Sequence, residues 1–135
     1  MKTAVIYWSG TGNTQAMAEA IAEGAGVSAV NVSDFSGDIA EYDSIAFGCP
    51  AMGAEVLEEG EFEPFFESIE TKLSGKSVLL FGSYGWGDGE WMRTWEDRVK
   101  NLGASLIDGE GFIVNETPDV TALEQCRNLG EKLCK

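Results

Sequence analysis

A segment rich in glycine and hydroxyl side chains near the amino terminus, Ser9–Thr14 (SGTGNT), is suited to holding a phosphate. Its glycines let the backbone turn N–H groups inward, and its hydroxyls add further donors. The segment has neither the GK[ST] of nucleoside triphosphate loops nor the GxGxxG of dinucleotide sites. A tight turn with a capping hydroxyl is the alternative, but it needs neither two glycines nor so many hydroxyls. The sequence therefore predicts a site for a terminal phosphate.

A second segment, Pro50–Glu55 (PAMGAE), combines a predicted turn with a methionine. Gly53 allows a turn that needs φ > 0 at its first central position. The soft side chain of Met52 is suited to lying against an aromatic ring. Taken alone, the segment is better explained as an ordinary turn with methionine as core filler.

A third segment, Gly82–Gly89 (GSYGWGDG), places two large aromatic residues among four glycines. Glycines offer no side chains to pack against, so Tyr84 and Trp86 are not expected to be core residues. Exposed aromatic rings on such a loop favour stacking on a flat ligand. A hot spot for binding another protein is the competing interpretation.

The elements that position these segments alternate between strands and helices. Each of the three segments follows a short apolar run. The predicted strands are Thr3–Tyr7, Ala29–Val32, Ser44–Phe47, Ser77–Phe81 and a fifth in two pieces, Ala104–Ile107 and Phe112–Val114. Apolar residues at helical spacing predict helices from Ala16 to Gly24, Phe62 to Ile69, Trp91 to Leu102 and Thr121 to Leu133, the last opened by a capping box of Thr121 and Glu124. This order predicts an α/β fold with a parallel sheet and helices on both faces.

Ligands of open α/β sheets bind beyond the carboxyl ends of the strands, and all three segments are predicted to lie at that edge. A phosphate-binding loop, a methionine turn and an aromatic loop together indicate a planar heterocycle with a monophosphate tail. No Lys or Arg lies near the first segment, so neutral dipoles alone would hold the phosphate.

The amino-acid composition excludes several classes of function. The 135 residues suit one domain over 1–135, and the absence of histidine excludes an imidazole base. Three cysteines without CxxC spacing disfavour a zinc site and fit a reducing cytoplasm, and no apolar stretch approaches the length of a membrane span. The net charge is −14, and residues 1–70 hold thirteen acidic residues against one lysine. Such a surface repels nucleic acid and anionic lipid and attracts a basic protein.

The chain closely resembles short-chain flavodoxins of clostridia and related anaerobes. The matching stretches are YWSGTGNT (7–14), GCPAMG with Glu55 (48–55), EFEPFF (61–66), FGSYGWGDGEWMR (81–93) and IVNETPD (113–119). The resemblance implies one doubly wound, five-stranded parallel sheet of strand order 2-1-3-4-5 with FMN at the switch point, an arrangement for which flavodoxin is the standard example.

The resemblance also implies a role for each site residue. Ser9, Gly10, Thr11, Gly12, Asn13 and Thr14 would wrap the FMN phosphate, and Ala51 and Ser83 would line the ribityl chain and ring. Met52 would lie on the inner flavin face and Trp86 on the outer one. Glu55 would form a hydrogen bond with the pyrimidine edge of the flavin ring, together with backbone N–H groups near Gly85. Gly53, Ala54, Tyr84 and Gly87 complete the expected cofactor-binding set, with Ala54 where relatives often carry a polar residue.

The implied function is a low-potential one-electron carrier, not an enzyme, that uses the semiquinone/hydroquinone couple of FMN. A flip of the Gly53–Ala54 peptide would offer the Gly53 carbonyl to the protonated flavin N5, a change that glycine allows at little cost. The negative charge of the surrounding protein would make the addition of a second electron to FMN unfavourable. Expected partners are flavodoxin or ferredoxin reductases and ferredoxin-dependent oxidoreductases that present basic surfaces to a monomer.

Two other functions fit the same elements less well. An FMN-dependent quinone reductase needs a substrate pocket and usually an oligomer, and no insertion here supplies either. A signalling receiver needs a phosphoacceptor aspartate after the third strand, where Cys49-Pro50 stands instead. Seven glutamates without a basic residue among them follow the methionine turn: Glu55, Glu58, Glu59, Glu61, Glu63, Glu67 and Glu70. They predict either a solvated helix face or, as we favour, a docking surface for basic partners.

Overall fold

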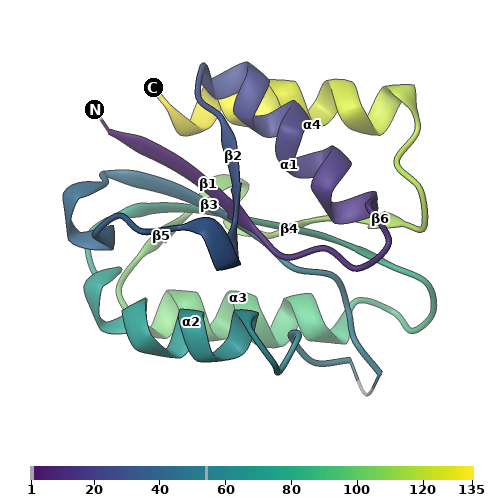
Figure 1. Ribbon diagram of the computed structural model, residues 1–135, viewed down its shortest axis with the longest axis horizontal. Helices are drawn as coiled ribbons and strands as arrows, with labels where there is room; N and C mark the ends of the chain where they lie inside the picture. The colour runs from purple at the N-terminus through teal and green to yellow at the C-terminus, as the bar shows by residue number, and fades with distance from the viewer. Residues whose placement is uncertain (1, 54) are drawn as a thin grey trace.

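The computed structural model describes residues 2–53 and 55–135 and shows a parallel sheet between two layers of helices (Figure 1). The strands are β1 (Thr3–Tyr7), β2 (Ala29–Asn31), β3 (Ser44–Gly48), β4 (Ser77–Tyr84), β5 (Ser105–Leu106) and β6 (Phe112–Asn115). Their order is β2-β1-β3-β4-β5, with β6 also paired to β4, and each of these pairings is parallel. The predicted fold class and strand order are therefore confirmed.

The fifth position of the sheet is shared by two segments, as predicted. β5 pairs with the start of β4 at Ser77 and Val78, and β6 pairs with its end from Phe81 to Tyr84. Between them a short 3-10 turn, Ile107–Gly109, carries the chain from one half of the position to the other. β6 thus ends at the same edge of the sheet as β4.

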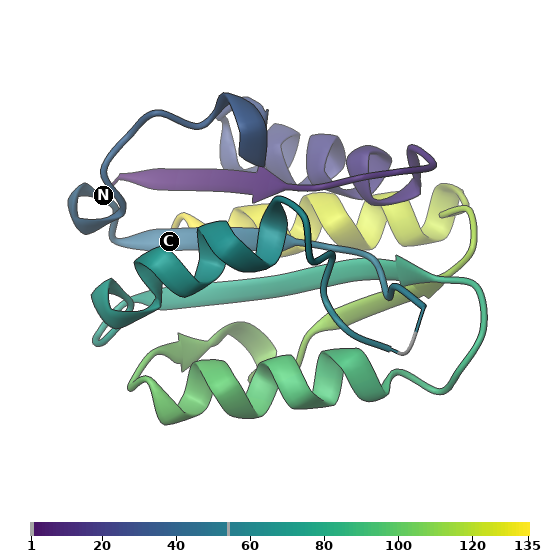
Figure 2. The ribbon, with the colours of Figure 1, turned by 60° about the horizontal axis from the view of Figure 1, so that its bottom comes forward.

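The helices cover the two faces in pairs, as Figure 2 shows. α1 (Asn13–Ala25) packs with α4 (Val120–Leu133) on one face, while α2 (Phe62–Ile69) and α3 (Glu90–Asn101) cover the other. Glycines allow the close approach of α1 and α4, since a Cβ on Gly24 would collide with the Arg127 carbonyl and one on Gly130 with the Ile21 carbonyl. None of the described helices is long and apolar enough to cross a membrane.

Aromatic residues build the core beneath α2 and α3. The ring of Trp95 meets those of Phe62 and Phe66 edge-on, with centroids 5.5 and 5.8 Å apart. Trp91 and Trp95 are both buried in this core. These contacts fix the two helices that follow the methionine turn and the aromatic loop.

Two element boundaries differ from the sequence prediction. α4 is capped by Asp119, whose carboxylate accepts from the Ala122 N–H at 2.8 Å, so the predicted capping box at Thr121 is wrong. Asp119 competes successfully because it stands directly before the first helical residue, where a side-chain oxygen reaches the free N–H groups. β4 extends through Tyr84, three residues beyond the apolar run that predicted it.

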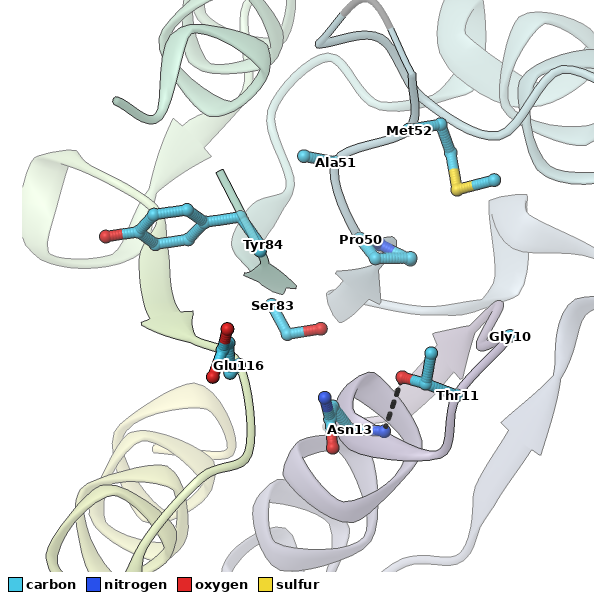
Figure 3. Close-up of a pocket in the computed structure, with 10 residues that line it drawn as sticks. Gly10, Thr11, Asn13, Pro50, Ala51, Met52, Ser83, Tyr84 and Glu116 are labelled. Carbon is cyan, nitrogen blue, oxygen red and sulfur yellow. Dashed lines mark hydrogen bonds between the residues drawn. The ribbon is translucent and has the colours of Figure 1, made fainter. Parts of the chain in front are cut away.

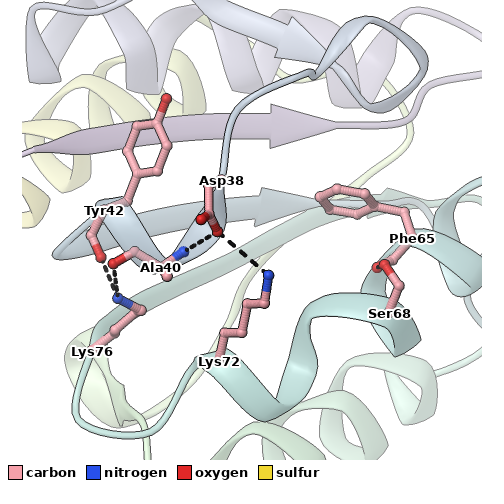
Figure 4. A network of polar contacts seen from close by, with 7 residues as sticks. All are labelled: Asp38, Ala40, Tyr42, Phe65, Ser68, Lys72 and Lys76. Atoms are coloured by element: carbon pink, nitrogen blue, oxygen red, sulfur yellow. Dashed lines mark hydrogen bonds and ion pairs between the residues drawn. The ribbon is translucent and has the colours of Figure 1, made fainter.

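Residues 35–41, between β2 and β3, are held by polar contacts at the edge of the sheet where β3 and β4 begin. A 3-10 turn, Ile39–Glu41, is capped by Asp38, which accepts from the Ala40 N–H at 3.0 Å. Lys72 lies 3.4 Å from Asp38, and Lys76 donates to the carbonyl of Tyr42 at 2.6 Å (Figure 4). Two of the few basic residues of the chain are therefore used for local structure.

Candidate functional site

The three predicted segments meet at the carboxyl edge of the sheet. Tyr7 of β1 pairs with Gly48 of β3, which in turn pairs with Phe81 of β4, so neighbouring strands end close together. They surround a cavity of about 340 Å³, within the roughly 300–1,000 Å³ typical of ligand sites (Figure 3). The lining residues are Gly10, Thr11, Asn13, Pro50, Ala51, Met52, Ser83, Tyr84, Gly85 and Glu116.

The first wall of the cavity is the loop before α1. Gly12 has φ 97° and precedes the helix, which begins at Asn13. The Ser9 hydroxyl accepts from the Gly12 N–H at 3.0 Å and the Thr11 hydroxyl from the Asn13 N–H at 3.4 Å. None of the described residues that line the cavity is Lys or Arg. An anion bound here would meet neutral donors and the positive end of the α1 dipole.

Thr14, predicted to bind the phosphate, is buried and is not among the residues that line the cavity. Its hydroxyl lies 3.0 Å from the Ser83 hydroxyl and accepts from the Ser83 N–H at 3.3 Å. Both side chains are buried. This pair ties the start of α1 to the end of β4 and so fixes two walls of the cavity relative to each other.

The second wall is the methionine turn, which is closed by a short antiparallel bridge. The Met52 N–H donates to the Val56 carbonyl at 2.9 Å, and the Val56 N–H donates back to Met52 at 3.3 Å. Glu55 lies within this turn with φ 54°. Gly53 is exposed, a Cβ there would meet no atom within 4 Å, and its φ lies outside the left-handed range, so the predicted φ > 0 at Gly53 is wrong. The predicted site residue Ala54 lies outside the described residues. A smaller hollow of about 20 Å³ separates the turn from Gly85 and Trp86.

The Glu55 carboxylate is unusual because its Oε1 is buried and has no hydrogen-bond partner among the described residues. It lies against Gly87, whose φ is 87°. A Cβ at Gly87 would collide with Glu55 Oε1 and lie 2.7 Å from the carboxyl carbon. A buried acceptor without a donor is costly. The arrangement therefore fits a ligand that supplies an N–H group at this point.

The two aromatic residues of the third segment have different environments. Trp86 is 68% exposed beside the hollow, as expected for a ring that stacks on a ligand. Tyr84 is half-buried, and its ring lies 5.7 Å from that of Trp91, so part of the expectation for this residue is wrong. Because β4 continues through Tyr84, strand alternation turns its side chain toward the core below α3. Its backbone still borders the cavity.

Two residues of the cavity were not predicted. Pro50 lies two residues beyond the end of β3. Glu116 directly follows β6, with φ 58° and an N–H that donates to the Tyr84 carbonyl at 2.7 Å. The available signal was that a fourth strand ends at this edge, in IVNETPD. Glu116 is the one carboxylate among the described residues that line this cavity.

The acidic run is only partly a free surface. Arg98 binds Glu63 through two bonds of 2.8 Å and Glu70 through one of 2.8 Å. These bonds raise the pKa of Arg98, although its burial acts in the opposite direction. Glu58 caps the start of α2. The exposed members of the run are Glu59, Glu61 and Glu67.

Comparison with known proteins agrees with this site. The family model described as Flavodoxin matches residues 5–130. Flavodoxins of Clostridium beijerinckii and Megasphaera elsdenii are each 50% identical to the chain, over 96% and 97% of both partners respectively. The solution structure of two-electron reduced M. elsdenii flavodoxin superposes with a TM-score of 0.86 at 48% identity, over 98% of each chain. The chain therefore belongs to the flavodoxin family of FMN-binding electron carriers, which are not enzymes.

Proposed function

We propose that this flavodoxin-like domain, residues 1–135, binds FMN without a covalent bond in the cavity at the carboxyl edge and shuttles single electrons at low potential between redox enzymes. The observation that carries the proposal is the convergence of three dissimilar loops on one cavity, each suited to a different part of FMN. The chemistry that FMN supplies is the uptake and release of single electrons, accompanied by a proton at ring atom N5.

The phosphate would lie against the loop before α1. The hydroxyls of Ser9 and Thr11 can donate outward while they accept from the loop backbone. Gly10 and Gly12 keep side chains out of the way, and the N-terminus of α1 favours a negative group. The buried pair of Thr14 and Ser83 holds this loop at a fixed distance from the ribityl-binding strand.

The flavin ring would lie between Met52 and Trp86, with its pyrimidine edge toward Glu55. Glu55 Oε1 would accept a hydrogen bond from ring atom N3, which satisfies the buried acceptor. The Gly53 carbonyl would accept from N5 when that atom is protonated, and the peptide rotation that this requires costs little at a glycine.

The electrostatic setting favours the lower of the two one-electron couples. Glu55 and Glu116 border the site, and no described Lys or Arg lines the main cavity. Added negative charge on the cofactor is therefore poorly compensated, which lowers the potential of the second electron. The proposed working range is strongly reducing.

The proposed partners are flavodoxin or ferredoxin reductases and ferredoxin-dependent oxidoreductases that carry basic surfaces. The exposed glutamates at positions 59, 61 and 67, together with the net charge of −14, support electrostatic steering toward them. We propose that the protein acts as a monomer. Its three free cysteines support a reducing compartment, the cytoplasm.

An anaerobic reductive titration of the purified protein, followed by visible absorbance, tests the proposal. The expected result is a yellow protein that passes through a blue form at one electron per flavin before it bleaches. Direct two-electron bleaching, with turnover of an added quinone, would indicate a reductase instead. A colourless protein that takes up no FMN would overturn the assignment of the cavity.

A further inference from the structure

The loop that carries Met52 and Glu55 is closed at its base by a cysteine and a glutamate. We define the Met52 loop as residues 49–58, of which Ala54 is outside the described residues. The Glu58 N–H donates to Cys49 Sγ at 3.3 Å, which joins the two ends of the loop. Cys49 is buried, and its carbonyl accepts from the Trp91 indole N–H at 3.1 Å. The base of the loop is therefore anchored to the core.

The Glu58 side chain fixes the direction in which the chain leaves this base. Its Oε2 accepts from the Gly60 N–H at 2.7 Å, and its Oε1 accepts from the N–H groups of Glu61 and Phe62, each at 2.8 Å. Its carbonyl accepts from the Glu63 N–H at 2.8 Å. Burial raises the pKa of Glu58, but the three side-chain bonds outweigh it and the pKa is lowered. The carboxylate thus holds the Met52 loop rigidly on the first turn of α2.

The same contacts extend to the opposite wall of the cavity. The Glu61 carboxylate accepts from the Trp8 indole N–H at 3.3 Å. The Trp8 ring lies beside Gly10, where a Cβ would come within 3.1 Å of it. A chain of contacts therefore runs from the base of the Met52 loop, through the α2 N-terminus, to the phosphate-binding loop.

We infer that Glu58 is a positioning residue for the cofactor, which sets the placement of the Met52 loop against the phosphate loop without touching the flavin itself. This inference rests on the proposed function. Glu58 is surrounded by acidic neighbours in the sequence, yet its contacts distinguish it from them. Glu59, the adjacent residue, is exposed and carries the same charge.

The test compares three variants of the full chain. Glu58→Ala removes every side-chain acceptor, Glu58→Gln keeps one oxygen that can still accept from Glu61 and Phe62, and Glu59→Gln removes the same charge one residue away. The FMN dissociation constant is measured by quenching of flavin fluorescence. Visible circular dichroism of the bound flavin reports its geometry, and urea unfolding of the apoprotein reports stability.

We expect the FMN dissociation constant of E58A to rise about tenfold, as for loss of a hydrogen bond to a charged group. The dissociation constant of E58Q should rise less. That of E59Q should stay within about twofold of the wild-type value because exposed charges interact weakly. The visible dichroism should change in E58A alone. If E58A and E59Q bind FMN equally, or if E58A loses only apoprotein stability, the inference is wrong. If the wild type itself takes up no FMN, the proposed function fails instead.

Discussion

Substitution of Gly87 by alanine, compared with a control glycine, separates the cost of a positive φ from the loss of a contact to FMN. Gly87 has φ 87°, where an L-residue costs about 1–2 kcal/mol of folding free energy. In addition, the new Cβ would occupy the place of Glu55 Oε1, so the Glu55 carboxylate must move. The variant should therefore lose both stability and the acceptor that we assign to the flavin pyrimidine edge.

Gly75→Ala is a matched control. Gly75 has φ 81°, nearly the same as Gly87, but no atom lies within 4 Å of the position that its Cβ would take. It stands before β4, at the opposite end of that strand from the cavity. G75A therefore has the same backbone cost and leaves Glu55 in place.

The assay is urea unfolding of both apoproteins together with FMN titration. Both variants should be destabilised by about 1–2 kcal/mol. Only G87A should bind FMN more weakly, by roughly tenfold to a hundredfold, because a hydrogen bond to a charged group contributes about 1.5–3 kcal/mol. Equal FMN affinities in G87A and G75A would refute the role given to the Glu55 carboxylate.

Three further substitutions test separate parts of the site. Glu116→Gln removes a carboxylate from the cavity lining, so a bound anion meets less repulsion. FMN binding should tighten by about threefold, and the potential for adding the second electron should rise. An unchanged dissociation constant and an unchanged potential would exclude an electrostatic effect of Glu116 on FMN. Thr14→Val should lower the unfolding free energy by about 1–3 kcal/mol in urea, because the Ser83 N–H loses its acceptor, and an unaltered midpoint would contradict the buried pair. The pKa of Glu58 is lowered from its ordinary 4.5, so its stabilisation is full above pH 4.5 and is lost as the pH falls through the folded value. The unfolding free energies of wild type and E58Q should accordingly converge below pH 4.5, and a constant difference down to pH 3 would show that protonation of Glu58 is not involved.

The sequence was sufficient to predict the strands of the sheet and the edge at which the three segments meet. Apolar runs such as TAVIY and SVLLF are buried on both faces, and each is followed by a segment of unusual composition. Parallel strands bring their carboxyl ends to one edge, so the convergence of the loops follows from strand order alone. The strands and loops follow from local composition, which a sequence displays, whereas the strand order was implied by the resemblance to flavodoxins.

Other features depend on contacts between distant residues, which composition does not display. The expectation that Tyr84 would not be a core residue failed in part because β4 gains three residues by pairing with β6, a partner some thirty residues away. Glu116 was missed because it lines the cavity only when β6 ends at the same edge of the sheet as the three predicted segments. The cap at Asp119 was missed for a simpler reason: Asp119 and Thr121, two residues apart, are both residue types that cap helices, and the helix begins directly after Asp119.

The acidic run shows why charge counts alone overstate a docking surface. Seven glutamates between positions 55 and 70 suggested a uniform negative face. In the structure Glu58 holds the α2 N-terminus, Glu63 and Glu70 share Arg98, and Glu55 has a buried carboxylate oxygen beside Gly87. A carboxylate already bonded to N–H groups or to a guanidinium has a weaker field at a distance, because the donor compensates its charge. The proposed steering toward a basic partner would therefore depend mainly on the exposed residues Glu59 and Glu67, because the Glu61 carboxylate accepts from the Trp8 indole N–H.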